Sequence, residues 1–111
     1  MSDQIIDRVV FDELRATTGD DFVQELVDTF SEEAPGLLAQ MRDAQAAGQA
    51  DPFRRAAHSL KSNALTFGAA RLAQVARELE QGGLPPPGQD LSHVQVSLDE
   101  ALLALRELAR G

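Results

Sequence analysis

The sequence contains no cysteine, no tryptophan and no tyrosine. Without cysteine, the chain can form neither a disulfide nor a thiolate metal site. No apolar run approaches the roughly 20 residues that a membrane-spanning helix needs. The N-terminal segment MSDQIIDRVV has neither the basic start nor the long apolar stretch of a signal peptide. We therefore expect a cytoplasmic protein that does not enter a membrane.

Basic residues are also scarce, with ten against eighteen acidic residues and a net charge of −8. Nucleic-acid binding needs a basic face that neutralises phosphates, so we expect no nucleic-acid partner. The simplest interpretation of the acidity is solubility. The 111 residues, 43% of them hydrophobic, suffice for one core. We expect a single domain over residues 1–111. The length and the Met1 start favour a free-standing protein, and we expect a monomer because nothing indicates a second large apolar face.

Good helix formers dominate the composition, and apolar residues recur at steps of three and four. Asp7 is a candidate N-cap for a short first helix. The apolar phase continues across Pro35, which predicts one long helix with a kink there. Asp51 followed by Pro52 predicts the start of the third helix. The segment 82–88, GGLPPPG, predicts a loop. The predicted helices span residues 8–18, 20–47, 52–67, 69–81 and 91–109.

Four amphipathic helices with short connections favour an up-down-up-down four-helix bundle, so the fold class is all-α. The short extra N-terminal helix is expected to cap or flank this bundle. In the long second helix, the apolar stripe is predicted to begin at Phe22 and to pass through Phe30 and Met41 to Ala44.

The third helix carries a histidine and, three residues later, the only lysine of the sequence. If Leu60 points into the core, His58 lies roughly 200° around the helix from it, because each residue adds about 100°. We therefore expect His58 to face solvent. Residues three and four positions away share its face on the neighbouring turns. The residues expected around it are Arg54, Arg55, Lys61, Ser62 and Leu65.

An exposed imidazole among basic and small side chains suits phosphoryl transfer. The nucleophile must be an unprotonated ring nitrogen, and an unperturbed imidazole has a pKa of about 6.5. Charge in the transition state spreads over three phosphoryl oxygens, so a cation such as Lys61 supplies stabilisation. A small side chain at Ser62 lets another protein approach closely. The alternative is that His58 is merely one more exposed residue of a helix.

The stretch AAHSLKSNALTFGAARLAQVARELE resembles the signature of the histidine phosphotransfer (HPt) domain family of two-component phosphorelays. Over residues 7 to 81 the chain is similar to that family, and the last helix fits by length and pattern. One departure is Ser62, where many members have glycine, but serine is also small. The matching residues are His58, Leu60, Lys61, Ser62 and Gly68, followed by Leu72, Ala73, Leu79 and Glu80.

The resemblance implies a four-helix bundle in which His58 accepts a phosphoryl group on Nε2 and Lys61 stabilises its oxygens. It implies transfer from the aspartyl phosphate of one receiver domain to the aspartate of a second. The partners would be receiver domains of response regulators and of a hybrid histidine kinase. The chain would be a carrier rather than an enzyme, without ATP and without a cofactor, Mg²⁺ arriving with the receiver.

Docking is expected on the third helix, flanked by the first helix and parts of the second. Leu60 and Gly68 are expected to be structural positions of the motif. The docking residues expected are Arg54, Arg55, Ser59, Ser62 and Leu65.

Two other functions stay open. One is a helical adaptor that binds a receiver without carrying phosphate. Binding of this kind would tolerate His58→Gln. The other is a phosphatase in which Gln74 or Glu78 directs a water molecule. A histidine kinase dimerisation domain is excluded, because its histidine is typically followed by an acidic residue and it needs an ATP-binding domain for which this chain has no room.

Several other residues carry no predicted function. His93 lies outside any motif, so we expect a surface residue. The two histidines are 35 positions apart without HExxH spacing, so no metal site is predicted. The acidic pairs follow helical surfaces and predict no acid–base pair. These pairs are Glu32 with Glu33 and Glu78 with Glu80.

Overall fold

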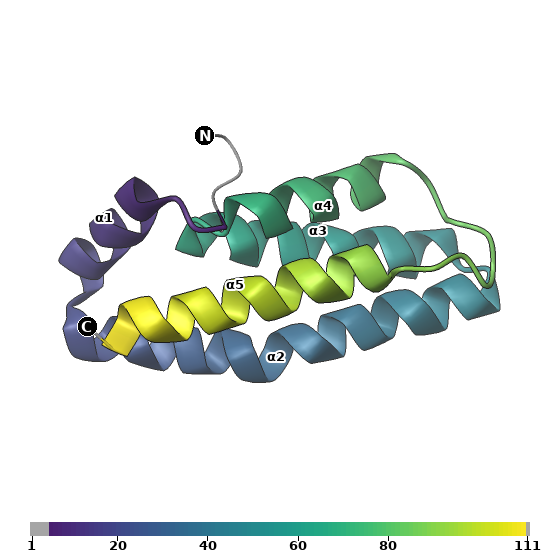
Figure 1. Cartoon of the computed structure of the whole chain (residues 1–111). Helices are drawn as coiled ribbons and strands as arrows, with labels where there is room; N and C mark the ends of the chain where they lie inside the picture. Colours follow the sequence, from purple (N-terminus) through teal and green to yellow (C-terminus); the bar gives the residue numbers. More distant parts are fainter. Residues whose placement is uncertain (1–4, 111) are drawn as a thin grey trace.

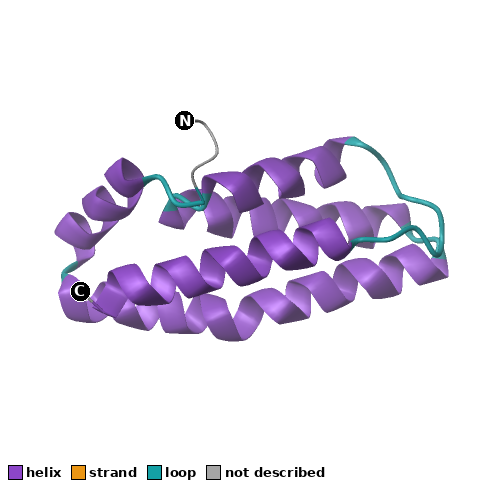
Figure 2. Ribbon diagram, viewed as in Figure 1, coloured by secondary structure: helices purple, strands orange, loops and turns teal. Residues whose placement is uncertain are grey.

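The computed structural model describes residues 5–110 and is built from helices and loops (Figures 1 and 2). Within these residues there is no strand, which confirms the all-α class. No helix among them is long and apolar enough to cross a membrane. The helices are α1 (Arg8–Thr18), α2 (Asp20–Ala47), α3 (Ala50–Phe67), α4 (Ala70–Gln81) and α5 (Ser92–Arg110).

Helices α2 to α5 lie side by side as a four-helix bundle and alternate in direction (Figure 1). Each packs against two neighbours: α3 lies against α2 and α4, and α5 also lies against α2 and α4. Helix α1 contacts α2 and α3 at one end of the bundle. The connections between the first four helices are short, whereas residues 82–91 form the long link at the opposite end (Figure 2).

Helix α3 begins at Ala50, two residues before the predicted start, and its N-cap is Gln49. The expectation that Asp51 would be the N-cap was therefore wrong. Gly48 ends α2 in the left-handed conformation, and the Gln49 N–H donates to the Ala44 carbonyl at 2.9 Å. Proline fits throughout a first turn, because those N–H groups have no intrahelical acceptor. Asp51 and Pro52 thus mark the first turn rather than its boundary.

Helix α2 runs as one helix through Pro35, as predicted, and the kink expected at Pro35 stays a prediction. Its buried stripe, however, begins at Val23 and continues through Val27 to Phe30. Phe22 is 50% exposed, so its predicted core position was wrong. Two stripes one residue apart, from Phe22 and from Val23, both follow steps of three and four and converge at Phe30. Periodicity alone did not decide between them.

The core-facing side of α3 agrees with the sequence prediction. Leu60 is fully buried, and the Phe67 ring stacks on Phe30 of α2 with 5.1 Å between centroids. Replacing a buried leucine such as Leu60 by alanine costs about 2–5 kcal/mol in comparable cores. The stripe that fixes the orientation of α3 comprises Phe53, Ala56, Ala57, Leu60, Ala64 and Phe67.

Gly68 joins α1 to the turn between α3 and α4. Its φ of +74° lies in the left-handed region, and its carbonyl accepts from the Asp7 N–H at 2.6 Å. A Cβ atom here would lie 2.7 Å from the Asp7 carbonyl oxygen and 2.9 Å from Val10 Cβ. Asp7 also caps α1 by accepting from the Val9 N–H at 3.0 Å. Only glycine fits both the backbone conformation and the close approach of α1.

The long link before α5 is fastened by a buried polar residue that the sequence did not single out. The Gln45 amide donates to the carbonyls of Pro86 at 2.8 Å and Gln89 at 3.0 Å. Gln45 occupies the inward face of α2, where an apolar residue would leave both carbonyls without this donor. The hydrogen bonds hold the link against the end of α2.

Candidate functional site

His58 lies on the solvent face of α3, as the helical phase predicted, with 55% of its side chain exposed. Leu60 fixes this orientation from the opposite side of the helix. The exposed residues on the same part of α3 include every expected docking position: Arg54, Arg55, Ser59, Ser62 and Leu65. The structure thus brings them together around His58.

A carboxylate from the next helix holds the His58 ring. The Nδ1 atom of His58 lies 2.8 Å from Glu80 Oε2, and the other oxygen of Glu80 lies 2.7 Å from Lys61 Nζ. Glu80 is only 17% exposed, because α4 turns this side chain toward α3. The expectation that Glu80 merely follows a helical surface beside Glu78 was wrong. Glu80 instead bridges His58 and Lys61.

This geometry determines which ring nitrogen of the neutral His58 carries the proton. An ionised carboxylate can only accept hydrogen bonds, so Nδ1 must donate to Glu80. The lone pair of a neutral imidazole is then on Nε2. The two nitrogens flank the ring carbon Cε1 and their bond directions diverge, so Nε2 does not point at Glu80.

Glu80 is held in its ionised form by both partners. The hydrogen bond from Lys61, and then that from His58, lower the pKa of the Glu80 carboxyl below its ordinary value, against the opposing effect of desolvation. A fixed acceptor that stays ionised keeps His58 in one tautomer and one orientation, as carboxylates do for histidines in other reactive sites.

Lys61 therefore has an observed contact that the sequence did not predict. Its side chain is 23% exposed, and its ammonium pairs with Glu80. This contact favours the ionised form of Glu80 beside His58. Lys61 is three residues from His58 on the same side of α3.

The remaining candidates lie outside this bridge. The Gln74 side-chain amide donates a hydrogen bond of 3.0 Å to the carboxylate of Glu78, one turn further along α4, and both side chains are exposed. His93 is exposed near the start of α5. Arg54 lies 3.6 Å from Asp51 on its own helix, an exposed pair of small energetic weight. Among residues 5–110, no group of three or more potential ligands could hold a metal ion.

The Hpt domain family model matches residues 25–108, which include α3, α4 and the His58–Glu80–Lys61 bridge. The chain belongs to the Hpt domain family. It is 30% identical over 81 residues to the phosphorelay protein LuxU of Vibrio harveyi, an alignment covering 73% of this chain and 71% of that protein. No solved structure gives a significant match. The function of this Hpt domain is histidine phosphotransfer in two-component signalling, and its partners are receiver domains.

Proposed function

We propose that His58 is the phosphorylated residue and that Nε2 is the atom that accepts the phosphoryl group. The observation that carries the proposal is the 2.8 Å contact between His58 Nδ1 and Glu80. It leaves the lone pair of Nε2 on the exposed side of the ring, where a partner's acyl phosphate can approach in line. His93 is also exposed, but it lies at the start of α5, outside the motif around His58.

The reaction balances without a proton leaving His58. The Nε2 lone pair forms the N–P bond while the P–O bond to the receiver's aspartate breaks, and that electron pair returns to the aspartate carboxylate. The Nδ1 proton stays on the ring, where Glu80 compensates the positive charge of the phosphorylated imidazole. Transfer to a second receiver reverses these steps, and the ring leaves as a neutral imidazole.

The protein acts in this proposal as a carrier rather than as a kinase. Its phosphoryl source is the receiver of a hybrid histidine kinase, its acceptor is the receiver of a response regulator, and both reactions take place in the cytoplasm. Mg²⁺ belongs to the receiver's half of the site. Lys61 keeps Glu80 ionised and adds positive charge beside the phosphoryl oxygens. The expected docking positions, Arg54, Arg55, Ser59, Ser62 and Leu65, surround the point of transfer.

The test is label transfer from a phosphorylated receiver. We expect the native protein to acquire an acid-labile, alkali-stable label, and His58→Gln to acquire none. His93→Gln is the matched control, because it removes the other exposed histidine, and it should be labelled like the native protein. If native protein took no label from any cognate receiver, or if His58→Gln kept it, the proposal would be wrong. Undiminished receiver binding by unlabelled native protein would favour the adaptor function instead.

A further inference from the structure

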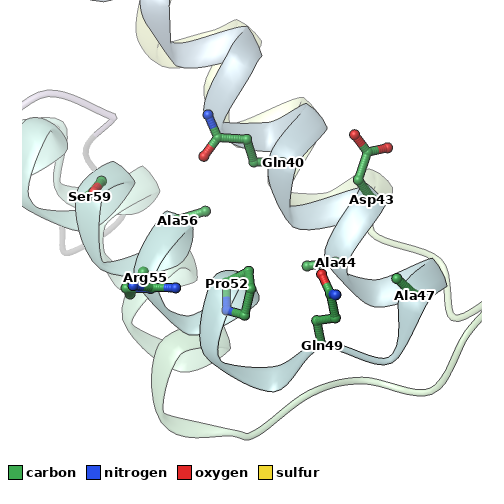
Figure 3. A pocket seen from close by; sticks show the side chains of 9 residues that line it. All are labelled: Gln40, Asp43, Ala44, Ala47, Gln49, Pro52, Arg55, Ala56 and Ser59. Carbon is green, nitrogen blue, oxygen red and sulfur yellow. The ribbon is translucent and has the colours of Figure 1, made fainter.

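A hollow of about 490 Å³ lies between the last turns of α2 and the first turns of α3. Figure 3 shows its wall on α3, which ends at Ser59, the residue after His58. The buried side chains of Ala44 and Ala56 form its base, and exposed residues, both apolar and polar, surround them. The lining residues are Ala44, Ala47, Pro52 and Ala56 on the apolar part, and Gln40, Asp43, Gln49, Arg55 and Ser59 on the polar part.

This hollow falls beneath any partner that reaches His58 with an interface of ordinary size. A small transient interface buries about 600 Å² on each partner, which corresponds to a circle of roughly 14 Å radius. The α3 wall extends from Pro52 to Ser59. Pro52 lies six positions before His58, or about 9 Å along the helix axis. A receiver centred on His58 therefore covers this wall.

The direction of the imidazole favours the same side. Glu80 engages Nδ1 from α4, so the other ring nitrogen, Nε2, is not directed at Glu80, and α2 packs against α3 separately from α4. On the α4 side, Lys61 and Glu80 already occupy the space beside the ring. A receiver that presents its aspartate to Nε2 has its free approach over α3 and the neighbouring part of α2.

We infer that this hollow is a specificity-determining contact for the receiver domain and takes an apolar side chain that protrudes from the receiver beside its aspartyl phosphate. The inference rests on the proposed role of His58. Apolar floors with polar rims are the usual form of interface anchors. Arg55 and Asp43 carry opposite charges on the rim and select a receiver with complementary groups around that side chain. None of the α2 residues belongs to the motif around His58.

The experiment fills the hollow and measures single-turnover transfer at increasing concentrations of phosphorylated receiver. Ala47→Arg places a long side chain over the hollow from an exposed position at the end of α2. We expect it to raise the half-saturating receiver concentration at least tenfold and to change the limiting rate by less than twofold. Ala46→Arg is the matched control, since Ala46 is the neighbouring exposed alanine but does not line the hollow. It should stay within twofold of the native protein.

A second pair of variants separates filling from charge. Ala47→Gln should weaken receiver binding more than Ala46→Gln, because both are uncharged and only one covers the hollow. Equal half-saturating concentrations for the two members of each pair would overturn the inference, as would an effect of Ala47→Arg on the limiting rate alone. Self-association through the hollow, seen as a native dimer that Ala47→Arg dissociates, would also overturn it. Failure of the proposed function looks different: the native protein then takes no label at any receiver concentration.

Discussion

Gly68→Ala should destabilise the protein through two separable effects at the α3–α4 turn. A Cβ residue in the left-handed conformation costs about 1.5 kcal/mol. The new Cβ would also meet the Asp7 carbonyl oxygen at 2.7 Å, so α1 must withdraw and the 2.6 Å hydrogen bond from Asp7 N–H to Gly68 is lost. That bond contributes about 1 kcal/mol. Alanine also lowers the conformational entropy of the unfolded chain, which offsets about 0.5 kcal/mol of this loss.

The expected net loss is therefore about 2 kcal/mol, which lowers Tm by roughly 8 °C for a chain of this length. Urea and thermal denaturation measure both quantities. Two other glycines isolate the contributions. Gly48 has a φ of +70°, and a Cβ atom added there would meet no other atom within 4 Å. Gly48→Ala should therefore lower the free energy of unfolding by only about 1 kcal/mol, through backbone strain. Gly36→Ala, in the interior of α2 with open space around it, should gain about 0.5–1 kcal/mol. If Gly68→Ala and Gly48→Ala lost equal free energies of unfolding, the contact between α1 and Gly68 would contribute nothing, and the reasoning would be refuted.

Two further predictions concern the bridge around Glu80. Because the pKa of Glu80 is lowered from its ordinary value of 4.5, mainly by the Lys61 hydrogen bond, its stabilising effect is present above about pH 4.5 and disappears as pH falls through the lowered pKa. The difference in unfolding free energy between native protein and Glu80→Gln should shrink in acid, and a difference independent of pH would contradict this. Lys61→Ala should slow label transfer about tenfold or more, equivalent to about 1.4 kcal/mol of transition-state stabilisation. Arg106→Ala removes an exposed cation of α5 as the control, and an equal rate for both variants would exclude Lys61 from the mechanism.

The outward face of α3 was predictable from the sequence, because it depends only on the phase of one helix. Phe53, Leu60 and Phe67 repeat at seven-residue steps, which place His58 on the opposite side whatever the neighbours are. The first turns of α2 were not predictable in the same way. Phe22 and Val23 both begin acceptable stripes, and only packing against other helices buries Val23. The periodicity of a single helix therefore predicted the exposed face of α3 correctly but did not predict which residues of α2 are buried.

The Glu80 contact belongs to a pair of helices, so no property of α3 alone could reveal it. The sequence nevertheless contained a usable signal. Glu80 follows Ala76 by four residues and Ala73 by seven, which places a carboxylate on the inward stripe of α4. In an antiparallel hairpin, residues equally distant from the turn lie level. His58 precedes Gly68 by ten residues and Glu80 follows it by twelve, so a turn centred near Ala69 sets the two side by side.

The turn at Gly68 thus links three features of the protein. Its left-handed conformation ends α3, its missing side chain admits α1, and its position along the chain sets the register that joins His58 to Glu80. One residue added between Gly68 and Glu80 would rotate the carboxylate by about 100° around α4 and remove it from the imidazole. The spacing from His58 to Gly68 in the motif has a physical meaning only together with the spacing from Gly68 to Glu80. The reactive unit is therefore the α3–α4 hairpin, and the five motif residues that end at Gly68 describe only its first half.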